Sequence, residues 1–314
     1  MKKYLYTIAT VLVFGMSANA QEPAKEKAKE PEPATKEKKD FDKKFRFGLR
    51  LAAQPTWFTS NENNNVPKGA VFGTGFGLNM EIRASDIVAF VTGIGADFEG
   101  GKYTFRRTLE KDNFYEVSYW QTKDGEFKEP ENGKDFKFLN NENSTRYVLK
   151  DRTIKTTHIT IPAILKLSTN EYSGMKYFGM FGAEIGIRVK TTVKDNYYTS
   201  FQYNPNGFAK AGTDSINGAG EATGENINLN RDMAVVPIRV GFNAGLGFEY
   251  RLGGSTAFFC SINYFRAFTN TMRGTSKLMS TTIDTSDPSG KVTYVMAKQN
   301  FVANAIRINI GILF

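Results

Sequence analysis

Residues 301–314 read FVANAIRINIGILF, and this stretch decides the fold class. From Val302 to Phe314, alternate positions carry bulky apolar side chains with an interruption at Asn304, while the positions between them are mostly small or polar. Alternation with a period of two is typical of a β-strand with one apolar and one polar face. The chain therefore ends in a strand that separates an apolar from a polar environment.

The same alternation recurs along the chain. In residues 238–243, IRVGFN, large apolar side chains again alternate with polar or small ones. Seven segments besides the last show the pattern: 45–58, 71–83, one starting near residue 87, 151–168, 176–190, 235–252 and 256–269. Eight strands is an even number, as single-chain bacterial outer-membrane barrels require.

The connections between these segments alternate in length. Three links are short: one around 84–86, one of about seven residues after position 168, and one at 253–255. Four links are long: 59–70, 108–150, 191–234 and 270–297. Membrane barrels have short periplasmic turns and long extracellular loops. The sequence therefore predicts an all-β fold over 45–314, an eight-stranded antiparallel transmembrane β-barrel with long extracellular loops and both termini in the periplasm.

The first 44 residues differ from the rest. Lys2 and Lys3 precede an apolar run over 5–14, and Ala18-Asn19-Ala20 provides an A-x-A cleavage site. This arrangement predicts a signal peptide over 1–20, cleaved after Ala20. Residues 21–44 are rich in Lys, Glu and Pro and contain almost no apolar side chain, which predicts a disordered periplasmic tether.

Composition narrows the function. The mean hydropathy is −0.39, and past residue 20 no apolar run approaches the ~18 residues of a membrane helix. The net charge of +9 is scattered along the chain, so nucleic-acid binding is not expected. One His and one Cys, Cys260, provide neither a metal cluster nor an intramolecular disulfide. We expect no metal and no cofactor.

Four short motifs resemble one known family. Residues 158–166, HITIPAILK, look like the E-I-P-L-L-x-K strand of PorT-like outer-membrane β-barrels of the Bacteroidota. Residues 177–183, 242–248 and 263–270 resemble glycine-bearing and R-Y-x-x-G-L-T-N strands of the same family, with Asn263 where the family often has Arg. The resemblance implies an eight-stranded outer-membrane barrel. The family's namesake is tied to type IX protein secretion.

Charged side chains gather on the face predicted to point into the barrel. The inward positions hold Arg46, Arg50, Glu81, Arg83, Asp97, Glu99, Lys166, Glu184, Arg188, Arg239, Glu249, Arg251 and Arg307. They could line a conduit for anions or pair with one another. Eight strands enclose an interior only wide enough for side chains, and buried ions must be paired, which favours a structural lumen charge network.

Two features suggest a contact or an activity. His158, expected near the outer rim, could serve a lipid A-modifying enzyme, but no partner residue stands at an obvious spacing from it. The loops over 108–150 and 191–234 carry aromatic side chains, which either extend the strands above the membrane or form a contact surface. The candidate contact residues are Tyr115, Tyr119, Trp120, Tyr197 and Tyr198.

Three smaller expectations complete the analysis. Pro162 lies within a strand, where we expect a bulge or a lost ladder hydrogen bond. Arg266 is in phase with the lipid-facing side and is expected to reach the headgroups. Phe314, the terminal aromatic residue, is the expected assembly signal.

The sequence favours a non-enzymatic outer-membrane protein, either structural in the envelope or binding a partner through its extracellular loops. An accessory role in type IX secretion is the alternative, and a lipid A-modifying barrel enzyme comes third. The expected partners are outer-membrane lipid, the barrel-assembly machinery during biogenesis, and a protein at the extracellular loops.

Overall fold

The computed structural model describes residues 44–60, 62, 65–106, 108–110, 113–122, 127–128, 144–198, 221–225, 235–272, 278–284 and 292–314. The predicted signal peptide and nearly all of the predicted tether, together with parts of the long connections, lie outside these ranges. None of the described residues forms a helix with the length and apolar character needed to cross a membrane.

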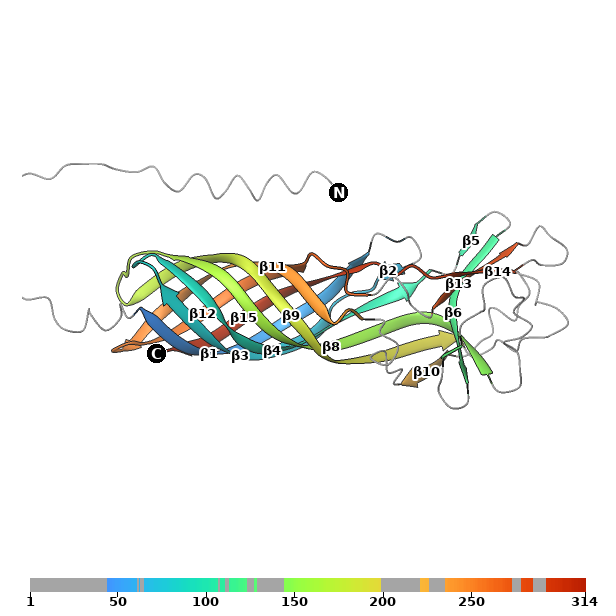
Figure 1. Cartoon of the computed structure of the whole chain (residues 1–314), viewed down its shortest axis with the longest axis horizontal. Helices are drawn as coiled ribbons and strands as arrows, with labels where there is room; N and C mark the ends of the chain where they lie inside the picture. The colour runs from blue at the N-terminus through green and yellow to red at the C-terminus, as the bar shows by residue number, and fades with distance from the viewer. Residues whose placement is uncertain are drawn as a thin grey trace, which may run out of the picture. The chain divides into compact units, whose positions relative to one another are not determined.

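Eight long strands form a closed antiparallel barrel (Figure 1). They are β1 (Phe45–Ser60), β3 (Val71–Arg83), β4 (Val88–Phe105), β8 (Ser144–Ser168), β9 (Met175–Tyr198), β11 (Ile238–Gly253), β12 (Thr256–Ala267) and β15 (Phe301–Leu313). Each strand pairs with the next in this order, and β15 returns to β1 from Gly48↔Leu313 to Ser60↔Phe301. The predicted eight-stranded barrel is confirmed.

The two ends of the barrel differ. Tight turns join β3 to β4, β8 to β9 and β11 to β12 at the end where β1 begins and β15 finishes, and there the amide of Phe314 donates to the carbonyl of Phe47 at 2.8 Å. Ser173 and Gly174 have positive φ in the β8–β9 turn, as Gly254 has in the β11–β12 turn. The four long connections all lie at the other end, so the predicted alternation of short and long links is confirmed.

The barrel is apolar outside and polar inside. On β15, the outward Ile306, Ile308 and Ile310 are 41–46% exposed, whereas the inward Arg307 and Asn309 are 0% and 5% exposed. All eight long strands share this arrangement. We call their exposed apolar side chains the apolar belt: Phe45, Phe47, Leu49, Leu51, Phe72, Phe76, Leu78, Phe90, Ile94, Phe98, Ile161, Leu167, Tyr177, Phe181, Ile185, Ile187, Phe242, Leu246, Tyr250, Ile262, Tyr264, Ile306, Ile308, Ile310 and Ile312. A surface of this kind is stable in lipid, which identifies the barrel as a membrane barrel.

The prolines interrupt the ladders without shifting them. Between β4 and β8 the pairing skips from Val91↔Ile164 to Gly95↔Thr160, a gap centred on Pro162, and the register is unchanged. Proline has no N–H to donate, so a lost ladder bond is the outcome at Pro162, and no bulge forms there. The same gap occurs between β1 and β15 beside Pro55.

A bulge does occur in β9. The register passes from Thr157↔Lys190 to His158↔Arg188, so that Val189 is the extra residue. An extra residue reverses the facing of all later side chains. Alternation alone places Lys190 in the lumen, and this is wrong: Lys190 is exposed, and the inward positions beyond the bulge are Thr191, Val193 and Asp195.

The barrel wall continues beyond the apolar belt as extra β-structure, to the right in Figure 1. Short strands lie within the long connections: β2 (Asn65–Pro67), β5 (Thr108–Glu110), β6 (Asn113–Thr122), β7 (Phe127–Lys128), β10 (Glu221–Glu225), β13 (Met279–Asp284) and β14 (Val292–Met296). β6 pairs with the outer part of β8, β13 pairs with β6, and β14 pairs with β13. We call this part the outer extension. Extension of the strands is one of the two alternatives that the sequence left open for the loops over 108–150 and 191–234.

Candidate functional site: the barrel interior and the outer extension

Charged side chains form a first cluster toward the turn end of the lumen. Lys166 Nζ donates to Glu81 Oε2 at 2.6 Å and also pairs with Glu249. Arg46 Nη1 donates to Glu249 Oε2 at 2.8 Å, and Arg83 Nε donates to Glu81 Oε1 at 2.9 Å. We call these five residues the turn-side cluster. Three cations hold two carboxylates here, so each buried carboxylate is neutralised.

A second cluster, the loop-side cluster, lies further along the lumen. Arg307 donates through Nη1 to Glu184 Oε2 at 2.5 Å and through Nη2 to Glu99 Oε1 at 2.8 Å. Arg239 pairs with Glu99 and donates through Nη2 to Glu184 Oε1 at 3.1 Å. Two guanidiniums and two carboxylates, all buried, therefore balance in charge. Loss of any one of these side chains would leave an uncompensated buried charge.

Glycines make room for these side chains. The Arg239 and Arg307 guanidiniums lie over the Phe265 ring, 4.3 and 4.6 Å from its centroid. A Cβ on Gly241 would stand 2.5 Å from Phe265, and one on Gly186 would stand 3.2 Å from Arg239. Glycines on one strand thus leave room for large inward side chains of the neighbouring strand, since Gly186 is the ladder partner of Arg239 and Gly241 lies on the strand next to Phe265.

A polar layer separates the clusters. Arg50 Nη2 lies 3.2 Å from Asp97 Oδ1. An amide chain runs beside this pair: Asn309 donates to Asn263 at 3.1 Å, Asn263 to Asn243 at 3.0 Å, and Asn243 to Glu184 Oε2 at 3.2 Å. A cavity of about 60 Å³ is lined by Arg50 and by the side chains of this amide chain, together with residues around them. One water molecule needs ~10–15 Å³ of cavity volume, so this cavity can hold a few water molecules. It is too small to be a wide passage through the lumen.

Comparison with known proteins gives similarity of fold only. No protein-family model and no curated protein matches the chain. Similar crystal structures are Neisserial surface protein A (9% identity, TM-score 0.31, covering 86% of this chain and 96% of that one), OprG from Pseudomonas aeruginosa (11%, 0.35, 87% and 98%) and the outer membrane protease OmpT from Escherichia coli (10%, 0.29, 86% and 96%).

The fold is that of an outer-membrane β-barrel. The closed topology and the apolar exterior carry this conclusion. The similar structures include one described as a surface protein and one described as a protease, so the likeness selects no activity.

The sequence-predicted lumen residues do not all join the clusters. Nine of the thirteen form the two clusters, and Arg50 and Asp97 form the pair between them. Arg251 lies at the turn end, where it pairs with Glu171 at 2.5 Å, and both side chains are at least 20% exposed. Arg188 is half-buried beside the β9 bulge, opposite His158 in the ladder.

His158 lies inside the lumen, among the side chains of the loop-side cluster. It is 3% exposed, and its Nδ1 stands 3.6 Å from Glu99 Oε2, within the loop-side cluster. The imidazole is therefore buried among charged side chains of the lumen. The described residues also contain no group of His, Cys or carboxylate side chains that could hold a metal.

The outer extension has an apolar core of its own. Its buried side chains are Phe58, Tyr103, Phe105, Val117, Tyr119, Leu149, Ile154, Val193, Val235, Met272, Leu278, Ala297 and Phe301. Tyr119 is 1% exposed, so its expected role as a surface contact is wrong: β6 turns this side chain inward against β8. The structure does not describe the side chains of the other four candidate contact residues, which are Tyr115 and Trp120 on β6 and Tyr197 and Tyr198 on β9.

The sequence analysis missed a buried ion pair in the extension. Arg152 donates to both carboxylate oxygens of Asp195, at 2.6 and 2.8 Å. Arg152 occupies an inward position in the alternation of its predicted strand, so the sequence could have predicted that it is buried in the interior. Asp195 could not be found in this way, because the bulge at Val189 reverses the phase before it is reached.

Proposed function

We propose that this chain is a non-enzymatic outer-membrane protein that presents the outer extension at the cell surface as a rigid platform for a protein partner. One observation supports this most strongly: the barrel wall rises beyond the apolar belt around its own buried core. Phe301 packs against Tyr103 at 4.2 Å and Phe58 at 5.8 Å between ring centroids, joining β15, β4 and β1 above the belt. A structure needed only to span the membrane has no use for this core.

The packing of the barrel interior favours a structural role for the protein and disfavours a channel. The turn-side cluster, the polar layer and the loop-side cluster follow one another along the lumen, and the aromatic core of the extension lies beyond them. A water column would require several buried ion pairs to break together, each leaving an uncompensated charge. We therefore assign the lumen a structural role.

The orientation can be tested with single cysteines. In membrane barrels the tight turns face the periplasm, which places the extension outside the cell. In a Cys260→Ser background, Val295→Cys (61% exposed, on β14) should react with an impermeant maleimide on intact cells. Tyr172→Cys (83% exposed, in the β8–β9 turn) should react only after permeabilisation. The reverse pattern would place the extension in the periplasm.

The partner can be tested by photo-crosslinking. A benzophenone amino acid at Val295 on intact cells should give one discrete adduct of protein mass. The same group at Tyr172 serves as the matched control and should not give this adduct. If neither position gives an adduct across growth conditions, the platform role is wrong and an envelope-structural role remains.

The motifs that resemble PorT-like barrels of the Bacteroidota support a second candidate, an accessory role in type IX secretion. In residues 158–166, the motif's Lys166 lies in the turn-side cluster. Loss of the protein should then block export of type IX substrates, and secretion subunits should co-purify with the barrel from gently solubilised membranes. Normal export and no co-purified subunits would remove this candidate.

A further inference from the structure

A groove opens in the barrel wall at the loop-side edge of the apolar belt. The β3–β4 ladder ends at Thr74↔Phe98, whereas β3 stays paired with β1 up to Thr56↔Val71 and β4 stays paired with β8. The two strands therefore part above this point. The resulting groove has a volume of about 390 Å³, within the ~300–1,000 Å³ of ordinary ligand pockets.

Polar side chains from β1 seal the gap on its inner side. Gln54 Nε2 lies 3.1 Å from the Thr74 carbonyl and 3.4 Å from the Phe98 carbonyl. The Thr56 hydroxyl accepts from the Gly100 amide at 2.8 Å. Gln54 and Thr56 thus bridge the gap between β3 and β4 from the lumen side, and the buried Glu99 and Thr156 form the inner part of the groove lining.

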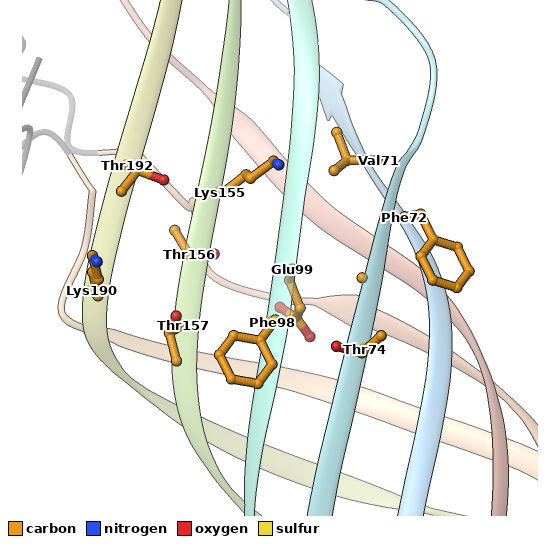
Figure 2. Close-up of a pocket in the computed structure, with 11 residues that line it drawn as sticks. Val71, Phe72, Thr74, Phe98, Glu99, Lys155, Thr156, Thr157, Lys190 and Thr192 are labelled. Carbon is orange, nitrogen blue, oxygen red and sulfur yellow. The ribbon is translucent and has the colours of Figure 1, made fainter. Parts of the chain in front are cut away.

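The groove combines cations, hydroxyls and aromatic rings (Figure 2). It is lined by Val71, Phe72, Gly73, Thr74, Phe98, Glu99, Lys155, Thr156, Thr157, Lys190 and Thr192. Figure 2 shows the Lys155 side chain reaching from β8 toward β4. Phe72 and Phe98, which belong to the apolar belt, are 72% and 42% exposed. Polar recognition groups thus stand directly beside the lipid-facing surface.

The charge of the lining favours an anion. Lys155 and Lys190 are exposed, and the β9 bulge is what turns Lys190 outward to the groove. Glu99 is the carboxylate among the lining residues, and it is neutralised from the lumen side by Arg239 and Arg307. Lysines placed where an apolar surface meets water bind anionic headgroups, while their stems lie along the apolar surface.

We propose that this groove binds the phosphate-bearing headgroup of an anionic membrane lipid. Lys155, Lys190 and the threonine hydroxyls hold the phosphate, and the acyl chains lie along Phe72 and Phe98. Only the assignment to the outer leaflet rests on the orientation proposed above. Phosphate binding itself needs neither that orientation nor a protein partner.

The test is a lipid titration of the full mature chain refolded in maltoside micelles, with thermal unfolding as the readout. Dihexanoyl phosphatidic acid should raise the unfolding midpoint saturably, and dihexanoyl phosphatidylcholine should raise it much less. Lys155→Gln with Lys190→Gln should weaken the apparent affinity about 30-fold, since each lysine near a charged lipid surface contributes about a factor of five. Thr192→Glu should also weaken binding, because it puts a carboxylate into the groove.

The matched control is Lys68→Gln with Lys298→Gln, which removes the same charge from exposed positions outside the groove. This variant should bind phosphatidic acid as the wild type does. An equal loss of affinity in both double variants would show general charge attraction and overturn the site. Equal stabilisation by inorganic phosphate at the same concentration would overturn the lipid assignment. The unfolding midpoint of each variant without lipid reports whether it has folded.

Discussion

Replacing Arg307 with Met tests whether buried ion pairs hold the barrel together. Arg307 is fully buried, donates to Glu184, Glu99 and Gln54, and lies over Phe265. Methionine retains an unbranched apolar chain and removes the charge. Glu99 and Glu184 are then left with Arg239 alone, so the loop-side cluster carries one uncompensated negative charge. Breaking a buried pair from one side costs ~3–5 kcal/mol, which is the expected loss of unfolding free energy.

The measurement is guanidinium unfolding of the refolded protein in detergent micelles, followed by tryptophan fluorescence. Arg251→Met is the control, because the Arg251–Glu171 pair is partly exposed at the turn end and should contribute no more than ~1 kcal/mol. Adding Glu184→Gln to Arg307→Met restores neutrality and should recover part of the loss. A double-mutant cycle then isolates the coupling between the two residues.

Two outcomes would refute this reasoning. Equal destabilisation by Arg307→Met and Arg251→Met would mean that burial adds nothing to the pair in the lumen. No recovery in the double variant would mean that Arg307 acts through packing on Phe265 rather than through charge.

Three further predictions follow from the fold. Ile308→Arg, in the middle of the apolar belt, should lower the unfolding free energy in vesicles by ~2–4 kcal/mol. Phe268→Arg, beyond the end of β12, should lower it by at most ~1 kcal/mol, and equal losses would mean that the belt is placed wrongly. Phe301→Ala should cost ~3–5 kcal/mol and make the outer extension sensitive to protease, because Tyr103 loses its packing partner; an unchanged digestion pattern would contradict this. In planar bilayers the monomer should show no steady ohmic step, and a reproducible step lost on changing Arg239 would identify a pore.

Alternation predicted the membrane strands because lipid and lumen impose opposite polarity on neighbouring residues. The predicted 71–83 coincides with β3, but 176–190 stops short of β9, which runs to Tyr198. Beyond the belt the outward positions contact water and need not be apolar, as Lys190 shows. The bulge at Val189 then reverses the phase, and no local pattern announces an inserted residue.

The candidate sites show the same division between local and remote information. The sequence placed Arg307 in the lumen correctly, because its charge and its position in the alternation can be read from its own strand alone. The burial of Tyr119 depends on β8 and β13, which pair with β6 from distant parts of the sequence. Asn304, the interruption in the first motif, is explained by side chains on two other strands: Tyr264 donates to it at 2.9 Å, and it lies 3.3 Å from Thr59 Oγ1.

The gap in the ladder beside Pro55 bears on how the barrel forms. Every neighbouring pair in the ring follows chain order except β1 and β15, which are the first and the last of the eight. Their meeting closes the longest loop, and the entropy lost on loop closure grows with loop length. That seam is also divided, with pairs at 48–53 and 56–60 of β1 and none at Gln54 and Pro55. We therefore expect the pairing of β1 with β15 to be a late step of folding, in which the paired segments on the two sides of Gln54 and Pro55 form separately.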